Sequence, residues 1–129
     1  MISLEAHASL TGPILAGKPE QVVKEALAYA LTQAGQAATE HVHRVLDQKI
    51  RHPTPYYETQ ITLDQPPGHV RVHDRDVPYG PWLEGTSPRN TRSRFKGYHA
   101  FRMSGEWLEP RLQGIVDQAV ARYVARLGG

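Results

Sequence analysis

Basic and aromatic side chains gather in one stretch of the sequence, residues 77–102, which reads VPYGPWLEGTSPRNTRSRFKGYHAFR. Arginine and lysine bind phosphates or carboxylates, and aromatic rings stack on bases or fill pockets at protein interfaces. The basic side chains of its central loop cannot be buried without partners, so this loop is predicted to lie on the surface and to bind something else. The expected contact residues are Tyr79, Trp82, Glu84, Arg89, Arg92, Arg94, Phe95, Lys96 and Tyr98.

Two kinds of partner fit this pattern. Four basic residues within eight positions, flanked by three aromatic residues, would suit a nucleic acid through phosphate contacts and base stacking. Trp82 and Trp107 favour a protein partner, because Arg, Trp and Tyr are the residue types enriched at the centres of interfaces. We weight a protein contact above direct nucleic-acid binding, with the second kept as the alternative. Glu84 is expected to form a salt bridge with an arginine of its own loop or of a neighbouring subunit.

Histidines and carboxylates raise the question of a metal site or a catalytic site. His69 and His73 are predicted on one face of a strand, and Asp74 and Asp76 follow them. Arg71 lies between the two histidines, and its charge opposes a bound cation. No serine has the strand–turn–helix context of an activated nucleophile, and the carboxylates are scattered rather than paired. We predict no catalytic residue, no metal, no cofactor and no enzymatic activity.

Charge is distributed unevenly along the chain. The net charge is +2, but residues 1–84 carry −3 and residues 85–129 carry +5. Five of the basic residues fall between Arg89 and Arg102. The total is too small for bulk nucleic-acid binding, so one basic lobe beside an acidic remainder is expected. The absence of cysteine suits a reducing compartment.

The chain shows no signal for export or membrane insertion. Its first residues, MISLEAHASLTG, lack a basic segment followed by an apolar run, so no signal peptide is expected. No apolar stretch approaches the roughly 20 residues that span a bilayer. We therefore expect no membrane contact.

Hydrophobic periodicity predicts the elements that must position the basic surface. Apolar residues at a spacing of two favour strands, and spacings of three and four favour helices. Pro78 and Pro81 lack N–H groups for a ladder, so their strand is expected at an edge or a bulge. Ser104 is available as the N-cap of the last helix. The predicted elements are a strand at 2–10, a helix at 19–49, strands at 57–64, 69–73 and 77–84, a basic loop at 85–97 and a helix at 104–127.

This order of elements predicts one α+β domain over residues 1–129. A small antiparallel sheet of about four strands is expected to pack against a long N-terminal helix and a C-terminal helix. The apolar stripe of the long helix is mostly alanine, so this helix is expected to lie close to its neighbours.

Residues 79–86, YGPWLEGT, followed by RN at 89–90 and RFKGY at 94–98, resemble a motif of the minor neck or tail-completion proteins of long-tailed bacteriophages. Members of this head-tail connector family commonly carry a Tyr-Ala/Gly-Pro-Tyr/Trp-Val/Leu-Glu strand at this place, and the order of elements is similar too. The link at 52–57, HPTPYY, lacks the Thr-Gly pair of many members. The longer basic loop is similar to an actinobacteriophage variant.

The resemblance implies a structural role in a siphovirus virion. It implies a homo-oligomeric ring, six-fold in preference to twelve-fold, that joins head and tail as a neck protein or tail terminator. Its neighbours would be adjacent connector, portal-side and tail-tube proteins, with non-specific contact to DNA in the lumen as an option. Assembly would take place in the cytoplasm of the host bacterium.

Overall fold

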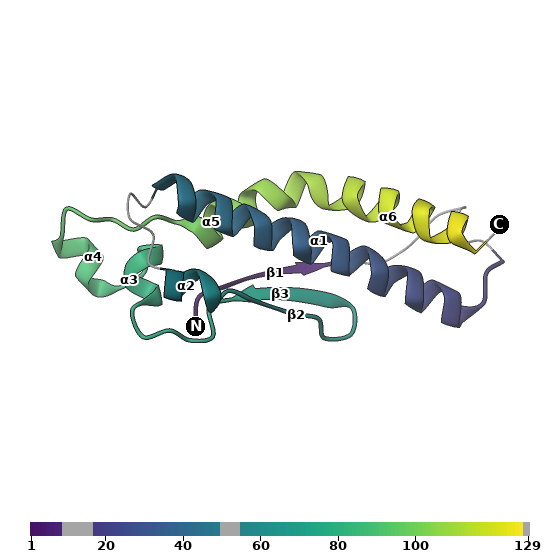
Figure 1. Ribbon diagram of the computed structural model, residues 1–129, viewed down its shortest axis with the longest axis horizontal. Helices are drawn as coiled ribbons and strands as arrows, with labels where there is room; N and C mark the ends of the chain where they lie inside the picture. Colours follow the sequence, from purple (N-terminus) through teal and green to yellow (C-terminus); the bar gives the residue numbers. More distant parts are fainter. Residues whose placement is uncertain (9–16, 50–54, 128–129) are drawn as a thin grey trace.

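Helices cover one face of a small antiparallel sheet in the computed structural model, which describes residues 1–8, 17–49 and 55–127 (Figure 1). The architecture is α+β, with a long N-terminal helix and a C-terminal helix, as predicted. In chain order the elements are β1 (Ser3–His7), α1 (Glu20–Lys49), α2 (Pro55–Thr59), β2 (Thr62–Asp64), β3 (His69–His73), α3 (Gly80–Glu84), α4 (Pro88–Arg92), α5 (Ala100–Leu108), the 3-10 turn η2 (Glu109–Arg111) and α6 (Leu112–Arg126).

The sheet has three strands in the order β1-β3-β2, with both pairs antiparallel. Leu4 pairs with Val72, and both side chains are buried on the face that meets the helices. Glu5 pairs with Arg71 on the opposite face, which carries mostly polar side chains. The period of two predicted for β1 and β3 is therefore confirmed. Residues 9 and 10 of the first predicted strand lie outside the described residues.

Helix α1 joins two apolar cores. Its C-terminal half packs with α5 against the sheet, and its N-terminal half packs against α6. Ala26 and Ala30 face Val116 and Val120 of α6, and these small side chains let the two helices approach closely. Gly35 faces the sheet, where an added Cβ would lie 2.6 Å from the side chain of Leu63.

The prediction of a fourth strand at residues 77–84 is wrong, because this segment forms a turn followed by α3. The buried carboxylate of Asp74 accepts the N–H of Asp76, and the Gly80 N–H donates to the carbonyl of Val77 at 2.9 Å. These local bonds curl the chain away from the sheet. Pro81 lies in the first turn of α3, where a missing N–H costs nothing, so the same proline fits a helix start as well as an edge strand.

Three other boundaries also differ from the prediction. Only residues 62–64 of the predicted strand 57–64 pair with β3, and the preceding turn is α2, where the Tyr57 hydroxyl donates to Asp74. The predicted basic loop contains the helix α4. The predicted helix 104–127 begins earlier, at Ala100, and tightens into η2 at Pro110, which has no N–H for the helical ladder.

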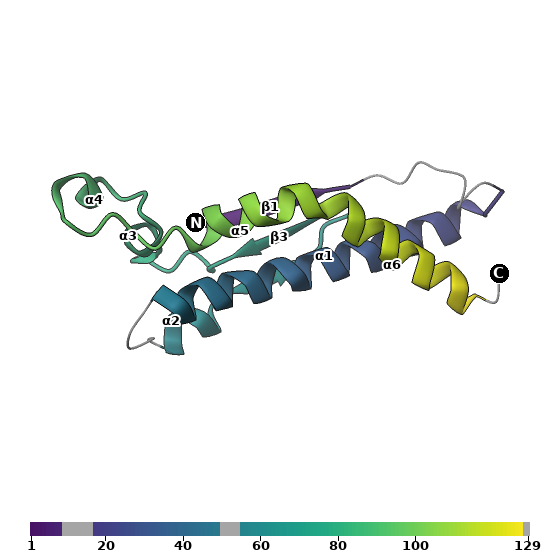
Figure 2. The same cartoon turned by 90° about the horizontal axis from the view of Figure 1, so that it is seen from above.

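The molecule is elongated, and α4 lies at one end of its long axis (Figures 1 and 2). Helix α6 and the N-terminal end of α1 lie at the other end. We name residues 80–98, which comprise α3, α4 and the return to α5, the tip. The tip contains most of the contact residues that the sequence predicted.

Candidate functional site at the basic tip

Two glycines close the base of the tip. Gly85 and Gly97 have φ angles of 102° and 98°, a region that favours glycine. A Cβ on Gly97 would lie 2.3 Å from the Cα of Gly85, so the two backbones cross in direct contact. The Tyr98 N–H donates to the carbonyl of Leu83 at 2.6 Å beside this crossing. The tip is therefore closed by backbone contacts that admit no side chain at these positions.

Asn90 organises the interior of the tip. Its side chain is buried, and its amide Nδ2 donates to the carbonyls of Trp82 at 3.2 Å and Phe95 at 3.1 Å. Its Oδ1 accepts the Ser87 N–H, and the Ser87 hydroxyl accepts the Arg89 N–H, which together cap the start of α4. One asparagine thus ties α3, α4 and the segment that returns toward α5 together. Asn90 was not among the predicted contact residues, although Ser87 three residues before it is the local signal of a capping box.

Glu84 has a different role from the one predicted. Its side chain is 6% exposed, and its two carboxylate oxygens accept the N–H groups of Phe101 at 2.9 Å and Arg102 at 3.0 Å. These are N–H groups of the first turn of α5, which have no partner within the helix. A carboxylate there also interacts favourably with the positive end of the helix dipole. Glu84 therefore caps α5 from a distance of 17 residues instead of forming the expected ion pair with an arginine.

Three aromatic rings pack into one cluster on the tip. The Phe95 ring lies 5.0 Å from the ring of Trp82 and 4.8 Å, edge to face, from the ring of Tyr98. The guanidinium of Arg89 lies 5.1 Å from the centre of the Trp82 ring, within the range of a cation–π contact. Tyr79 is separate from this cluster. It is exposed and lies 5.9 Å from the ring of Tyr57.

The exposed charges of the tip are all positive. Arg89, Arg92 and Arg94 are exposed, and within the described ranges none has a carboxylate within 4 Å. Lys96 already forms hydrogen bonds within the tip, because its Nζ donates to the carbonyls of Asn90 at 3.0 Å and Thr91 at 3.3 Å near the end of α4. Eight of the nine predicted contact residues are therefore exposed or partly exposed, on the tip or, for Tyr79, directly beside it. The ninth, Glu84, is buried.

The histidines and carboxylates that could have bound a metal have structural partners. His73 Nδ1 accepts the Arg75 N–H at 3.1 Å, which places the ring proton on Nε2, 2.6 Å from a carboxylate oxygen of Asp64. Asp74 is fully buried and accepts hydrogen bonds from Ile2 N–H, Asp76 N–H and the Tyr57 hydroxyl. In the part of the chain that the structure describes, no three such side chains are grouped to hold a metal ion.

One serine–histidine pair lies in the helical layer. His41 Nδ1 is 2.8 Å from the hydroxyl of Ser104, and its ring stacks on Trp107 at 4.5 Å. Desolvation, with the charges of Arg44 and Arg111, lowers the pKa of His41. Ser104 is completely buried inside α5, where no substrate reaches its hydroxyl, and it is not the N-cap that was predicted. The pair joins α1 to α5.

Comparisons with protein-family models, with curated proteins and with solved structures gave no match for this chain. Over residues 1–8, 17–49 and 55–127, no helix has both the length and the apolar character needed to cross a membrane.

Proposed function

We propose that this chain is a structural virion protein that forms a ring in the head-to-tail connector of a tailed phage. The observation that carries the proposal is the tip, which is built as a rigid, outward-facing, basic surface at one end of the molecule. Its backbone is held by Asn90 and by the Gly85–Gly97 crossing, so the segment that carries the arginines has its shape before any partner binds. Preorganisation of this kind lowers the entropy cost of association.

The aromatic cluster supports a protein partner over stacking on nucleobases. A base needs an open ring face, but Arg89 lies over Trp82, and Phe95 contacts both Trp82 and Tyr98. Phe101, one of the three aromatics expected beside the basic loop, is 2% exposed and belongs to the main core. What remains is a partly exposed aromatic centre with arginines around it, which is the composition of an interface hot spot.

The position of the tip supports a ring. The tip lies at one end of the elongated molecule (Figure 1). It carries four Lys/Arg and one Asp/Glu, and the rest of the chain carries 11 Lys/Arg and 12 Asp/Glu, a net charge of −1. A contact between the tip of one copy and a different surface of the next is heterologous, and it generates a ring if the rotation closes. Six-fold symmetry is favoured over twelve-fold, with portal-side, adjacent connector and tail-tube proteins as neighbours in the virion. This placement rests on the resemblance of the 79–98 motif.

Sedimentation velocity over a range of protein concentrations tests the proposal. We expect a discrete oligomer of fixed copy number, or assembly on purified portal or tail structures. The double variant Arg92→Ala, Arg94→Ala should lose this association. The variant Arg44→Ala, Arg122→Ala removes the same charge from two exposed helix positions and should keep it. A strict monomer at every concentration that also fails to join heads or tails would contradict the proposal.

Nucleic-acid binding is the second candidate function. It is favoured by Arg92 and Arg94, which are exposed and have no carboxylate within 4 Å among the described residues. A gel-shift titration against salt separates the two functions. Binding through two to four phosphates would give an affinity that falls with salt with a log–log slope of about −2 to −4. We expect a flat response and no shift at physiological salt.

A further inference from the structure

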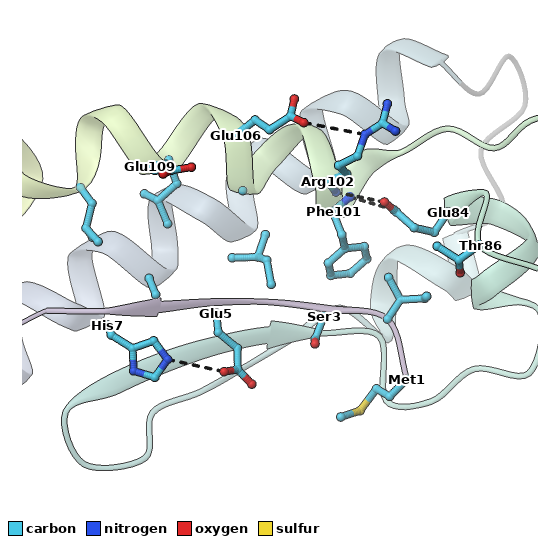
Figure 3. Close-up of a pocket in the computed structure, with 16 residues that line it drawn as sticks. Met1, Ser3, Glu5, His7, Glu84, Thr86, Phe101, Arg102, Glu106 and Glu109 are labelled. Carbon is cyan, nitrogen blue, oxygen red and sulfur yellow. Dashed lines mark hydrogen bonds and ion pairs between the residues drawn. The ribbon is translucent and has the colours of Figure 1, made fainter.

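A groove runs between β1 and α5, close to the base of the tip (Figure 3). Its volume is about 760 Å³, which is within the range of sites that hold ligands or clusters of side chains. Apolar side chains of β1, α5 and the start of α6 line its inner part. Leu4, Phe101, Leu108 and Leu112 are among them.

One wall of the groove is the unpaired edge of the sheet. The carbonyl of Ile2 accepts the Asp74 N–H, so Ile2 directs its backbone groups toward the β3 side. Backbone groups alternate in direction along a strand, so those of Ser3, Glu5 and His7 point to the open edge. Among the described residues, these edge groups have no hydrogen-bond partner. An unpaired edge of this kind favours contact with another chain.

The rim of the groove is mostly acidic. Glu5 from β1 and Glu106 and Glu109 from the far wall are exposed at its outer margins. Figure 3 shows the Glu5 carboxylate on the side of β1 away from α5, 3.6 Å from His7, and the Glu106 carboxylate directed away from β1. Among the residues that the structure describes, Arg102 is the only arginine or lysine that lines the groove, and its guanidinium lies 3.9 Å from the Glu106 carboxylate. The amino group of Met1 lies at one end and is held by Asp76 at 3.2 Å. Glu84 also borders the groove, but its charge is already satisfied by the start of α5.

We propose that this groove receives the tip of a second copy of the chain, an inference that rests on the ring proposed above. The charges of the two surfaces are opposite, with unpaired arginines on the tip and exposed glutamates on the rim. Helix α4 of the tip lies beyond the ends of β1 and α5, whose residues line the groove, along the long axis (Figure 2). The contact therefore joins different copies, and because tip and groove are different surfaces, each copy uses both at once in a head-to-tail ring.

Charge reversal tests the pairing of the two surfaces. The tip variant Arg92→Glu, Arg94→Glu and the groove variant Glu106→Lys, Glu109→Lys should each weaken self-association at least 10-fold. The quadruple variant carries both reversals, restores opposite charges at the contact and should associate within about 3-fold of the wild type. Glu40→Lys, Asp117→Lys is the matched control, because it makes the same charge change at two exposed helix positions outside the groove. Circular dichroism of each variant checks that the fold is intact.

Each outcome of this experiment decides between the proposals. Recovery in the quadruple variant supports contact between tip and groove. Loss of association in the tip variant with no effect of the groove variant overturns the groove as the receiving surface and leaves the ring standing. Weakening by both reversals without recovery shows that both surfaces take part in self-association but do not contact each other, and it overturns the pairing of groove and tip. Failure of the wild type to associate alone or on heads and tails rejects the ring as well.

Discussion

Removing the carboxylate of Glu84 should destabilise the protein although this residue lies in the predicted contact segment. Glu84→Ala deletes two charge-assisted hydrogen bonds to the first turn of α5. Each buried N–H left without a partner costs about 1–3 kcal/mol, and loss of the carboxylate at the helix N-terminus costs up to about 2 kcal/mol more. The Arg102 N–H is only partly buried and water can reach it, so we expect a total of about 3 kcal/mol. For a chain of 129 residues this lowers Tm by about 10 °C.

Urea unfolding followed by circular dichroism measures this loss. Glu84→Gln keeps the size of the side chain but replaces one carboxylate oxygen with an NH₂ group, which cannot accept a hydrogen bond from a helix N–H. It should therefore lower the free energy of unfolding by about 2 kcal/mol. Glu106→Ala is the control, because this exposed glutamate pairs with Arg102 at 3.9 Å and its removal should cost less than about 0.5 kcal/mol. If Glu84→Ala unfolds within about 0.5 kcal/mol of the wild type, the capping role is refuted and Glu84 is available for the ion pair that the sequence suggested.

Two further substitutions, one beside the buried Asp74 and one at the partly exposed Glu58, are tested by the same urea unfolding measurement. Gly80→Ala would place a Cβ 2.0 Å from a carboxylate oxygen of the buried Asp74, so we expect the free energy of unfolding to fall by about 2–4 kcal/mol. Gly114→Ala is the control, because open space surrounds this glycine, and it should raise the free energy of unfolding by up to about 1 kcal/mol. Equal effects of the two substitutions would contradict the packing around Gly80. Burial, followed by a hydrogen bond to Asp47 and its charge, raises the pKa of Glu58 to about 7 from its ordinary 4.5. The unfolded chain releases this proton more readily, so the contribution of Glu58 to stability is present below pH 4.5 and is lost as the pH rises through 7. Relative to the wild type, Glu58→Gln should therefore gain on the order of 1–2 kcal/mol between pH 5 and pH 8, and a difference that does not change with pH would contradict the shift.

Local patterns in the sequence predict the elements with clear apolar periodicity, which are α1, β1 and β3. Helix α1 begins within one residue of its predicted start, and β3 has its predicted bounds, because apolar periodicity reports which face of an element is buried. The segment 77–84 was predicted wrongly because Pro78 and Pro81 fit either an edge strand or a helix start. The choice depends on Asp74, whose carboxylate is buried by contacts from Ile2 and Tyr57 far along the chain.

The sequence predicted which residue types form the candidate site but not the contacts that hold the site in shape. Arginines and aromatics are visible in the sequence because their chemistry does not depend on their neighbours. The roles of Asn90, Gly97 and Glu84 depend on contacts with carbonyls, backbone atoms and N–H groups of other segments, so no local pattern shows them. The acidic groove is formed by segments about 100 residues apart in the sequence. Two of its glutamates, Glu106 and Glu109, lie in the half of the chain that carries a net charge of +5, so charge totals did not indicate it.

Electron microscopy of particles from phage that encode the tip variant tests the central claim most directly. With Arg92→Ala and Arg94→Ala in the chain, we expect heads and tails that form separately and do not join. Particles that carry Arg44→Ala and Arg122→Ala should be complete. Joined, infectious virions from the tip variant, at wild-type yield, would contradict the claim that the basic tip is the contact through which this chain connects head and tail.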